Sequence, residues 1–261
     1  MIGIIGGSGL EDPKLLKDFE EKKIETKFGK PSGAYTIGKL NGVEVAVLSR
    51  HGKTHSINPT NVNYRANIWG FKEFGVKAII ASSACGSLQE KIKPGELVFP
   101  NQFIDRTTKR DSSFYDKDRV CHISMANPFC FTLRNILTET AKKSGIKFHS
   151  NKTVITIEGP RFGTKAEGHV FQKWGAHVIN MTTVPEVVLA REAGIHYQTI
   201  NIVTDYDCVI EREEAVNLEM VLEGMKKSAQ KTREIISKAA TEINKTKFEC
   251  TCEKEIKNAI I

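Results

Sequence analysis

The sequence predicts a single α/β domain in which helices flank a mixed or mostly parallel sheet. Apolar runs of strand length alternate with helix-like stretches along all 261 residues, and this alternation is typical of α/β folds. Glycine or proline stands at most boundaries between them. No internal repeat, low-complexity linker or break in composition divides the chain. We therefore expect one domain over residues 1–245 and a C-terminal tail over residues 246–261 that contains Cys250-Thr251-Cys252.

The first half of the chain predicts four strands and one helix. Continuous apolar runs predict strands at Met1–Gly6, Val43–Ser49, Ala78–Ser83 and Leu97–Ile104. Asn58-Pro59-Thr60 is a helix-start signal, and we expect the helix to run to about Phe74 and to stop at Gly75. The segment from Asp105 to Met125 is polar and lacks periodicity. It is long for a passive loop, which indicates a functional or interface role.

The second half continues the alternation and ends in the clearest element. Helices are expected at Pro128–Gly145, Ala166–Trp174 and Pro185–Ala193, and strands at Thr153–Ile157, Val178–Met181 and Tyr197–Val203. A last helix is predicted because seven apolar residues share one stripe of a roughly 3.6-residue repeat. These residues are Leu218, Val221, Leu222, Met225, Ala229, Ile236 and Ile243.

Composition and charge exclude several classes of protein. The net charge is +7, but basic and acidic residues are interleaved and no basic stripe carries aromatics, so we expect no nucleic-acid partner. No run of about 18 apolar residues is present, so no membrane span is expected. The start of the chain has no basic leader and resembles a strand, which favours a cytoplasmic protein.

The six cysteines are expected to be buried thiols, as in most cytosolic chains. Cys250-Thr251-Cys252 is too tightly spaced for the paired cysteines of a common zinc site, so we expect no metal. A strained disulfide between Cys250 and Cys252 stays open as an alternative.

Polar residues follow several of the predicted strands, where α/β proteins usually bind ligands. Gly7-Ser8-Gly9 follows the first strand, Arg50-His51-Gly52 the second and Ser82-Ser83 the third. Backbone N–H groups at glycines, hydroxyl donors and an arginine fork together suit a free phosphate ion. Taken singly, each fragment also fits a turn, a surface arginine beside a structural histidine, or a helix cap.

Asp205 and Asp207 follow the last predicted strand and are two residues apart, so their side chains can point to the same side. A metal-binding pair and a capped turn are two interpretations. The one we favour is a purine clamp, in which one carboxyl group keeps its proton beside the other carboxylate and donates to purine N7. The second carboxylate then accepts from an exocyclic amine.

Several stretches of the chain resemble the signatures of methylthioadenosine phosphorylases, in order and with matching spacing from about Ile2 to about Leu222. The longest is Asn180-Met181-Thr182-Thr183-Val184-Pro185-Glu186-Val187-Val188-Leu189-Ala190. The others are Thr156-Ile157-Glu158-Gly159-Pro160-Arg161-Phe162, Gln102-Phe103-Ile104-Asp105-Arg106-Thr107-Thr108, Thr204-Asp205-Tyr206-Asp207-Cys208, Arg50-His51-Gly52 and Ala84-Cys85-Gly86-Ser87-Leu88.

This resemblance implies a nucleoside-phosphorylase α/β fold that assembles as a homotrimer or a dimer of trimers. It places phosphate at Ser8, Arg50, His51, Ser83, Ala84 and Thr182. It places Met181 under the ribose, Phe162 near the base, and Asp205 and Asp207 on the purine, with Asp205 as the acid. It implies that His122 reaches a neighbouring subunit's pocket. Leu218, Val221 and Leu222 match positions of the 5′ pocket, where apolar residues suit a methylthio group.

The expected reaction is phosphorolysis of 5′-deoxy-5′-methylthioadenosine to adenine and 5-methylthioribose 1-phosphate, with phosphate as co-substrate and no metal or organic cofactor. Two departures leave 6-oxopurine nucleosides (5′-methylthioinosine, inosine, guanosine) as the alternative. Gly163 stands where adenine-specific members usually have serine, and Leu218 is bulkier than the usual valine. The Cys-x-Cys tail resembles that of thermophilic members, which favours the disulfide.

Overall fold

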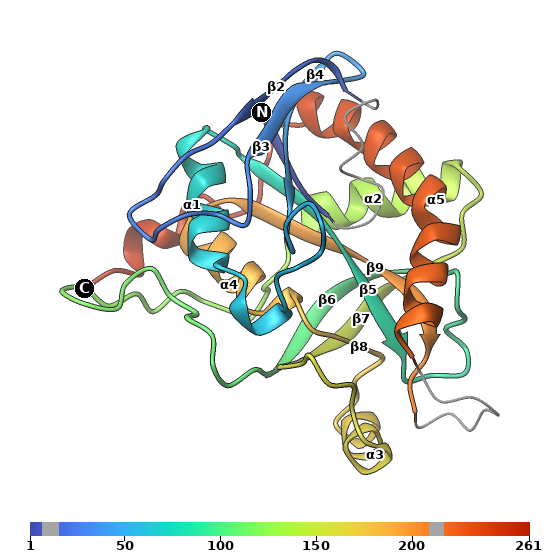
Figure 1. The fold of residues 1–261 in the computed structure, drawn as a ribbon. Helices are drawn as coiled ribbons and strands as arrows, with labels where there is room; N and C mark the ends of the chain where they lie inside the picture. The colour runs from blue at the N-terminus through green and yellow to red at the C-terminus, as the bar shows by residue number, and fades with distance from the viewer. Residues whose placement is uncertain (7–15, 209–216) are drawn as a thin grey trace.

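The computed structural model describes residues 1–6, 16–208 and 217–261, and these form a nine-stranded mixed sheet with helices on both faces (Figure 1). The sheet order is β2-β3-β4-β1-β5-β8-β7-β6-β9, with a further pairing between β5 and β9. The predicted α/β class with a mixed central sheet is therefore confirmed. Within the described residues, no helix is both long and apolar enough to cross a membrane.

Strand β5 is the centre of the sheet. The strands are β1 (Ile2–Gly6), β2 (Lys17–Lys22), β3 (Tyr35–Leu40), β4 (Val43–Ser49), β5 (Ala78–Ser87), β6 (Leu97–Arg106), β7 (Phe148–Ile157), β8 (Val178–Asn180) and β9 (His196–Tyr206). β5 pairs in parallel with β1 and β9, and its last residues pair with β8. Because β9 also pairs with β6, and β7 joins β6 to β8, this half of the sheet closes on itself as a ring.

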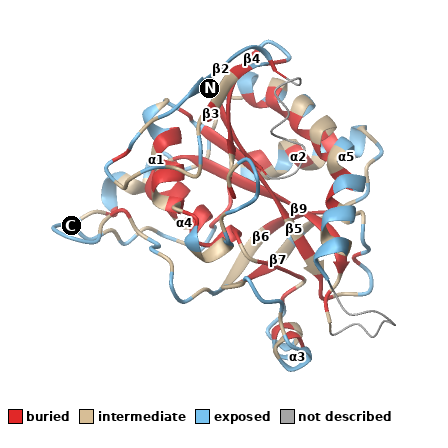
Figure 2. Ribbon diagram, in the orientation of Figure 1, coloured by how far each residue is buried: buried red, intermediate tan, exposed pale blue. Residues whose placement is uncertain are grey.

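Two pairs of helices cover the sheet. The helices are α1 (Tyr64–Glu73), α2 (Phe131–Lys143), α3 (Lys165–Lys173), α4 (Thr183–Glu192) and α5 (Leu218–Lys245), with short 3-10 helices at Pro59–Asn61 and Glu255–Asn258. In Figure 1, α1 and α4 lie together on one side, and α2 and α5 on the other. Each pair buries apolar side chains against the strands, which Figure 2 shows as largely buried. The core therefore has two main layers, and a smaller third cluster packs Phe171 of α3 against Ile155 and Ile179.

The first predicted helix starts later than expected. Asn58 does cap a helical turn, but this is the 3-10 helix over Pro59–Asn61, and Val62 then takes an extended conformation. A second cap, Asn63, accepts a hydrogen bond from the backbone N–H of Ala66 and begins α1. The expected start at Asn58 was wrong because the signal there begins a separate short turn.

Strand β9 is longer than predicted and carries an irregularity close to its end. Val203 pairs with Cys85 and Asp205 with Gly86, so Thr204 is one extra residue on β9. Such a bulge re-aims the neighbouring side chains. The sequence had indicated that Asp205 follows the strand, but Asp205 lies inside it.

The tail that follows α5 packs back onto the domain. Cys121 and Ile260 form an isolated bridge, and the backbone N–H of His122 donates to the carbonyl of Ala259 at 2.7 Å. The ring of Phe248 stacks on His196 with the ring centres 3.8 Å apart. The segment from Asp105 to Met125 thus contacts the end of the chain with its last part.

Candidate active site

A cavity of about 390 Å³ lies where β5, β8 and β9 end, between the loop after β4, the loop after β7 and the first turns of α5. Thirteen of the predicted site residues line it: Arg50, His51, Ser83, Ala84, Phe162, Gly163, Met181, Thr182, Asp205, Asp207, Leu218, Val221 and Leu222. Ser8 lies outside the described residues. His122 is exposed and does not line the cavity.

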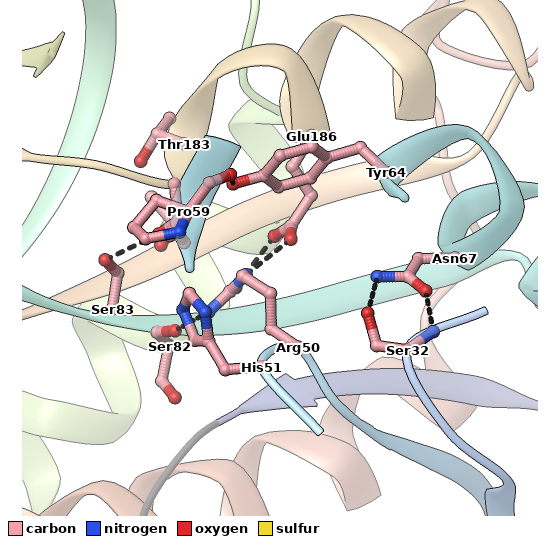
Figure 3. A network of polar contacts seen from close by, with 12 residues as sticks. Ser32, Arg50, His51, Pro59, Tyr64, Asn67, Ser82, Ser83, Thr183 and Glu186 are labelled. Atoms are coloured by element: carbon pink, nitrogen blue, oxygen red, sulfur yellow. Dashed lines mark hydrogen bonds and ion pairs between the residues drawn. The ribbon is translucent and has the colours of Figure 1, made fainter. Parts of the chain in front are cut away.

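One end of the cavity holds a buried arginine in a fixed position. Arg50 donates from Nε and Nη2 to the Glu186 carboxylate at 2.6 and 2.9 Å, and from Nη1 to the carbonyl of Ser82 at 2.8 Å (Figure 3). Burial alone would lower the pKa of Arg50, but the charge of Glu186 raises it above its ordinary value. The positive charge of Arg50 is therefore permanent. A guanidinium has five N–H donors, and since three of them bind Glu186 and Ser82, two are left for a ligand.

His51 is a neutral neighbour of this arginine. Burial and the charge of Arg50 lower its pKa to about 4. Nδ1 lies 2.8 Å from the carbonyl of Ile57, and because that oxygen can only accept, Nδ1 carries the proton. Nε2 is then a hydrogen-bond acceptor. A neutral His51 therefore suits a ligand atom that carries a proton of its own.

Hydroxyl groups from β5 and from the start of α4 meet beside the arginine. Ser83 Oγ and Thr182 Oγ1 are 2.9 Å apart, and both residues are buried. Asn180 holds this corner, since its Nδ2 donates to Thr183 Oγ1 at 2.7 Å and its Oδ1 accepts from Thr156 Oγ1 at 2.9 Å. One fixed cation, two hydroxyls and a neutral imidazole together can bind a protonated tetrahedral oxyanion.

The other end of the cavity holds the acidic pair. Asp205 is 4% exposed, and burial raises its pKa to about 6, with a further contribution from the charge of Asp207. Its Oδ2 accepts from Thr204 Oγ1 at 2.6 Å. Oδ1 lies against Gly86, where an added Cβ would be 3.0 Å away. Glycine at position 86 thus gives this carboxyl group its room, and Asp205 can act as a proton donor near neutral pH.

Asp207 is held in place from two sides. Its backbone N–H donates to the carbonyl of Ser87 at 2.9 Å, and Cys208 Sγ donates to its Oδ1 at 3.1 Å. Asp205 and Asp207 both line the cavity. The predicted placement of two carboxyl groups on one side of the chain is therefore what the structure has.

The apolar wall of the cavity comes from the start of α5. Leu218 and Leu222 are 64% and 47% exposed although both line the cavity. The helix approaches β9 closely here, because a Cβ on Gly224 would be 2.8 Å from Cα of Thr204. The position of this wall is therefore fixed by Gly224.

Two buried charged residues that support the site were not predicted. Arg110 donates to the carbonyls of Met181 and Val184, both at 2.7 Å, and pairs with Glu158. Glu186 holds Arg50. The sequence contained partial signals for both, since Arg110 lies in the long polar segment and Glu186 in the longest family-like stretch.

Comparison with known proteins agrees with this arrangement. Residues 1–241 match the model of the Phosphorylase superfamily. A relative named S-methyl-5′-thioadenosine phosphorylase, from Xenopus tropicalis, is 54% identical over 93% of this chain and 88% of its own length. A solved methylthioadenosine phosphorylase from Schistosoma mansoni, in complex with adenine, has a TM-score of 0.93 and 42% identity over 97% of this chain and 95% of its own.

A second Schistosoma mansoni structure has bound methylthioadenosine. It is a mutant of an adenosine/methylthioadenosine phosphorylase, with a TM-score of 0.93 and 40% identity over 99% of this chain and 97% of its own.

Proposed function

This chain belongs to the Phosphorylase superfamily and, within it, to the methylthioadenosine phosphorylases, and on that basis we propose that it splits 5′-deoxy-5′-methylthioadenosine with inorganic phosphate. The products are adenine and 5-methylthioribose 1-phosphate. One observation carries the proposal: a single cavity has an oxyanion site at one end and a buried acidic pair at the other. The relative solved with methylthioadenosine supports the choice of substrate.

The acidic pair acts on the purine. As the glycosidic bond breaks, electron density moves into the base, and a proton donated by Asp205 to N7 stabilises that charge. The pKa of about 6 keeps part of Asp205 protonated near neutral pH. Asp207 accepts from the 6-amino group.

Phosphate acts on the sugar. Arg50, Ser83 and Thr182 bind its oxygens, and Nε2 of His51 accepts a hydrogen bond from the phosphate oxygen that carries a proton. The bound anion stabilises the positive charge that develops at C1′ and then attacks that carbon. Holding the two reactants together lowers the barrier by several kcal/mol, at most about 7–11. Phosphate is the co-substrate, and the proposed reaction needs no organic cofactor or metal.

The 5′ end of the substrate lies against Leu218, Val221 and Leu222. These residues offer no hydrogen-bond partner to a 5′-hydroxyl, so a methylthio group is preferred. The comparisons give no support to 6-oxopurine nucleosides as the main substrates. Gly163 has open space, since an added Cβ would meet only Ile179, at 3.8 Å.

The assembly is a further part of the proposal. The resemblance of the sequence supports a homotrimer or a dimer of trimers in which His122 reaches a neighbouring pocket. His122 is exposed on this chain, as such a contact requires. A cytoplasmic location is also part of the proposal. None of the six cysteines, all of which lie within the described residues, forms a disulfide, including the Cys250–Cys252 pair for which the sequence favoured one, and this fits a reducing compartment.

A substrate panel tests the proposed function. Methylthioadenosine, adenosine, methylthioinosine and inosine are each incubated with the purified protein at saturating phosphate, and the free base is measured. We expect methylthioadenosine to have the highest kcat/KM. A higher value for either hypoxanthine nucleoside would contradict the proposed substrate.

A further inference from the structure

Four metal-ligating side chains meet at a place that the proposed reaction does not use. These are Cys130, His196, Cys250 and Cys252, and within the part of the chain that the structure describes their ligand atoms all lie within 4.8 Å of one another. We propose that they bind one zinc ion in a structural site. This inference is independent of the proposed function.

The distances among Cys130, Cys250 and His196 are close to those of a tetrahedral zinc site, and Sγ of Cys252 lies within 4.8 Å of all three ligand atoms. Sγ of Cys130 and Sγ of Cys250 are 3.6 Å apart. Nδ1 of His196 lies 3.5 Å from the first sulfur and 3.2 Å from the second. Bonds of about 2.3 Å to sulfur and about 2.0 Å to nitrogen give tetrahedral edges of about 3.8 and 3.5 Å. A disulfide needs sulfurs only about 2.0 Å apart.

The fold gathers the four residues from distant parts of the sequence. Cys130 is the residue before α2, His196 is the first residue of β9, and the two other cysteines lie in the tail. The backbone N–H of Cys130 donates to the carbonyl of Tyr197 at 2.9 Å, which fixes it beside His196. From the sequence, Cys250 and Cys252 had no further ligand nearby in the chain, and the fold adds Cys130 and His196.

The burial of the group favours a structural role. Cys130, His196 and Cys252 are buried, and Cys250 is half-buried. Four protein ligands leave no open position, which distinguishes structural zinc from catalytic zinc. His196 and Asp205 lie at opposite ends of the 11-residue strand β9, so the site is far from the cavity. The ion therefore joins the tail to α2 and β9.

The second ring nitrogen of His196 is buried, makes no hydrogen bond within the described residues, and has a carboxylate nearby that could serve as its partner in a zinc site. His196 Nε2 lies 3.4 Å from a carboxylate oxygen of Glu253. When Nδ1 binds metal, Nε2 carries the proton and donates toward that carboxylate, an arrangement that strengthens the ligand. The ring of Phe248 stacks on His196 with 15° between the planes and fixes its orientation.

Metal analysis tests the site on the full-length protein, purified under nitrogen without chelators. We expect inductively coupled plasma mass spectrometry to find one zinc ion per chain. Exchange for Co²⁺ should give thiolate-to-metal charge-transfer absorption and the intense visible bands of a tetrahedral ion. Cys252→Ser should lose the zinc, whereas Cys121→Ser, at a cysteine outside the group, should keep it. Glu253→Gln should weaken zinc binding about tenfold.

Two results would overturn the proposal. One is a fully reduced wild-type protein that binds neither zinc nor cobalt stoichiometrically. The other is a disulfide between Cys250 and Cys130 or Cys252 in the protein isolated under nitrogen, found as a mass lower by two hydrogens. The cobalt spectrum needs no variant, so it decides the question even where Cys252→Ser does not fold.

Discussion

Asp205 is a carboxyl group whose surroundings oppose its ionisation. It is buried beside Asp207, and its side chain accepts a hydrogen bond from the hydroxyl of Thr204. Burial therefore outweighs the stabilisation of the anion by that hydroxyl. Asp207, two positions further on, donates its own backbone N–H to the carbonyl of Ser87, and its carboxylate accepts from the thiol of Cys208. Two aspartates of one strand end thus take different roles.

Two variants of Asp205 test whether the residue acts as a proton donor. Asp205→Ala should lower kcat/KM for methylthioadenosine by about 10²- to 10⁴-fold, the usual contribution of a general acid. Wild-type kcat/KM should fall as pH rises through about 6, because the donor loses its proton. Asp205→Asn keeps an N–H donor of constant protonation, so its profile should lack that fall. An identical pH profile for wild type and Asp205→Asn would remove Asp205 from the role of acid.

Arg50 is expected to act through phosphate. In Arg50→Lys the charge remains, but the paired contact with Glu186 is lost. We predict at least a tenfold rise in the KM for phosphate, since hydrogen bonds to charged groups contribute about 1.5–3 kcal/mol. Arg65→Lys, at an arginine that pairs with Asp111 outside the cavity, is the matched control. An unchanged phosphate KM in Arg50→Lys would exclude this residue from the oxyanion site.

Val221 tests the selectivity at the 5′ end. Threonine has nearly the shape of valine, with a hydroxyl in place of one methyl group. Val221→Thr should therefore lower the ratio of kcat/KM for methylthioadenosine over adenosine by about tenfold. Val170→Thr, at an exposed position on α3, should leave the ratio unchanged. A ratio equal to wild type in Val221→Thr would mean that this side chain does not face the 5′ group.

At the scale of elements, the sequence predicted buried strands better than exposed ones. Val43–Ser49 is an apolar run and matches β4 residue for residue. β2 has the sequence Lys17-Asp18-Phe19-Glu20-Glu21-Lys22 and is exposed throughout, so it carries no apolar alternation to detect. β3 was missed although Asn41-Gly42, with positive φ at both residues, is a strong hairpin signal before β4.

The sequence also predicted only a part of the site. Side chains at strand ends could be predicted because the ends of parallel strands meet. The bulge at Thr204, the role of Arg110 and the gathering of Cys130 with the tail depend on contacts between distant segments. No local pattern encodes such contacts.

A single methyl group at position 224 should change the distance between α5 and β9. In Gly224→Ala the added Cβ would lie 2.8 Å from Cα of Thr204, so the start of α5 must shift outward. We expect a loss of about 1–3 kcal/mol in the free energy of unfolding and a higher KM for methylthioadenosine. Lys226→Ala, at an exposed position on the same helix, is the control. Wild-type stability and KM in Gly224→Ala would contradict the close approach.

For the whole molecule, two cavity residues should influence stability with opposite signs as pH falls. His51 has a pKa lowered from 6.5 to about 4. Between these two pH values the unfolded state binds more protons than the folded state, so stability falls on acidification. Asp205 has a pKa raised from 3.8 to about 6, so the folded state binds more protons and stability rises.

The variant Asp205→Asn removes the second effect alone. Its free energy of unfolding, measured in urea, should therefore fall more steeply than that of wild type from about pH 6 to about pH 4. Parallel curves for the two proteins would show that the Asp205 carboxyl is not held away from ionisation.

The fold brings the oxyanion end, with Arg50, Ser83 and Thr182, into one cavity with Asp205 and Asp207. The central claim is therefore that the protein transfers a sugar to phosphate. Phosphorus NMR of the protein with methylthioadenosine and phosphate tests it most directly. We predict that a sugar 1-phosphate resonance grows in step with free adenine and that no adenine appears when phosphate is omitted. Adenine released equally without phosphate, together with free methylthioribose, would contradict the account.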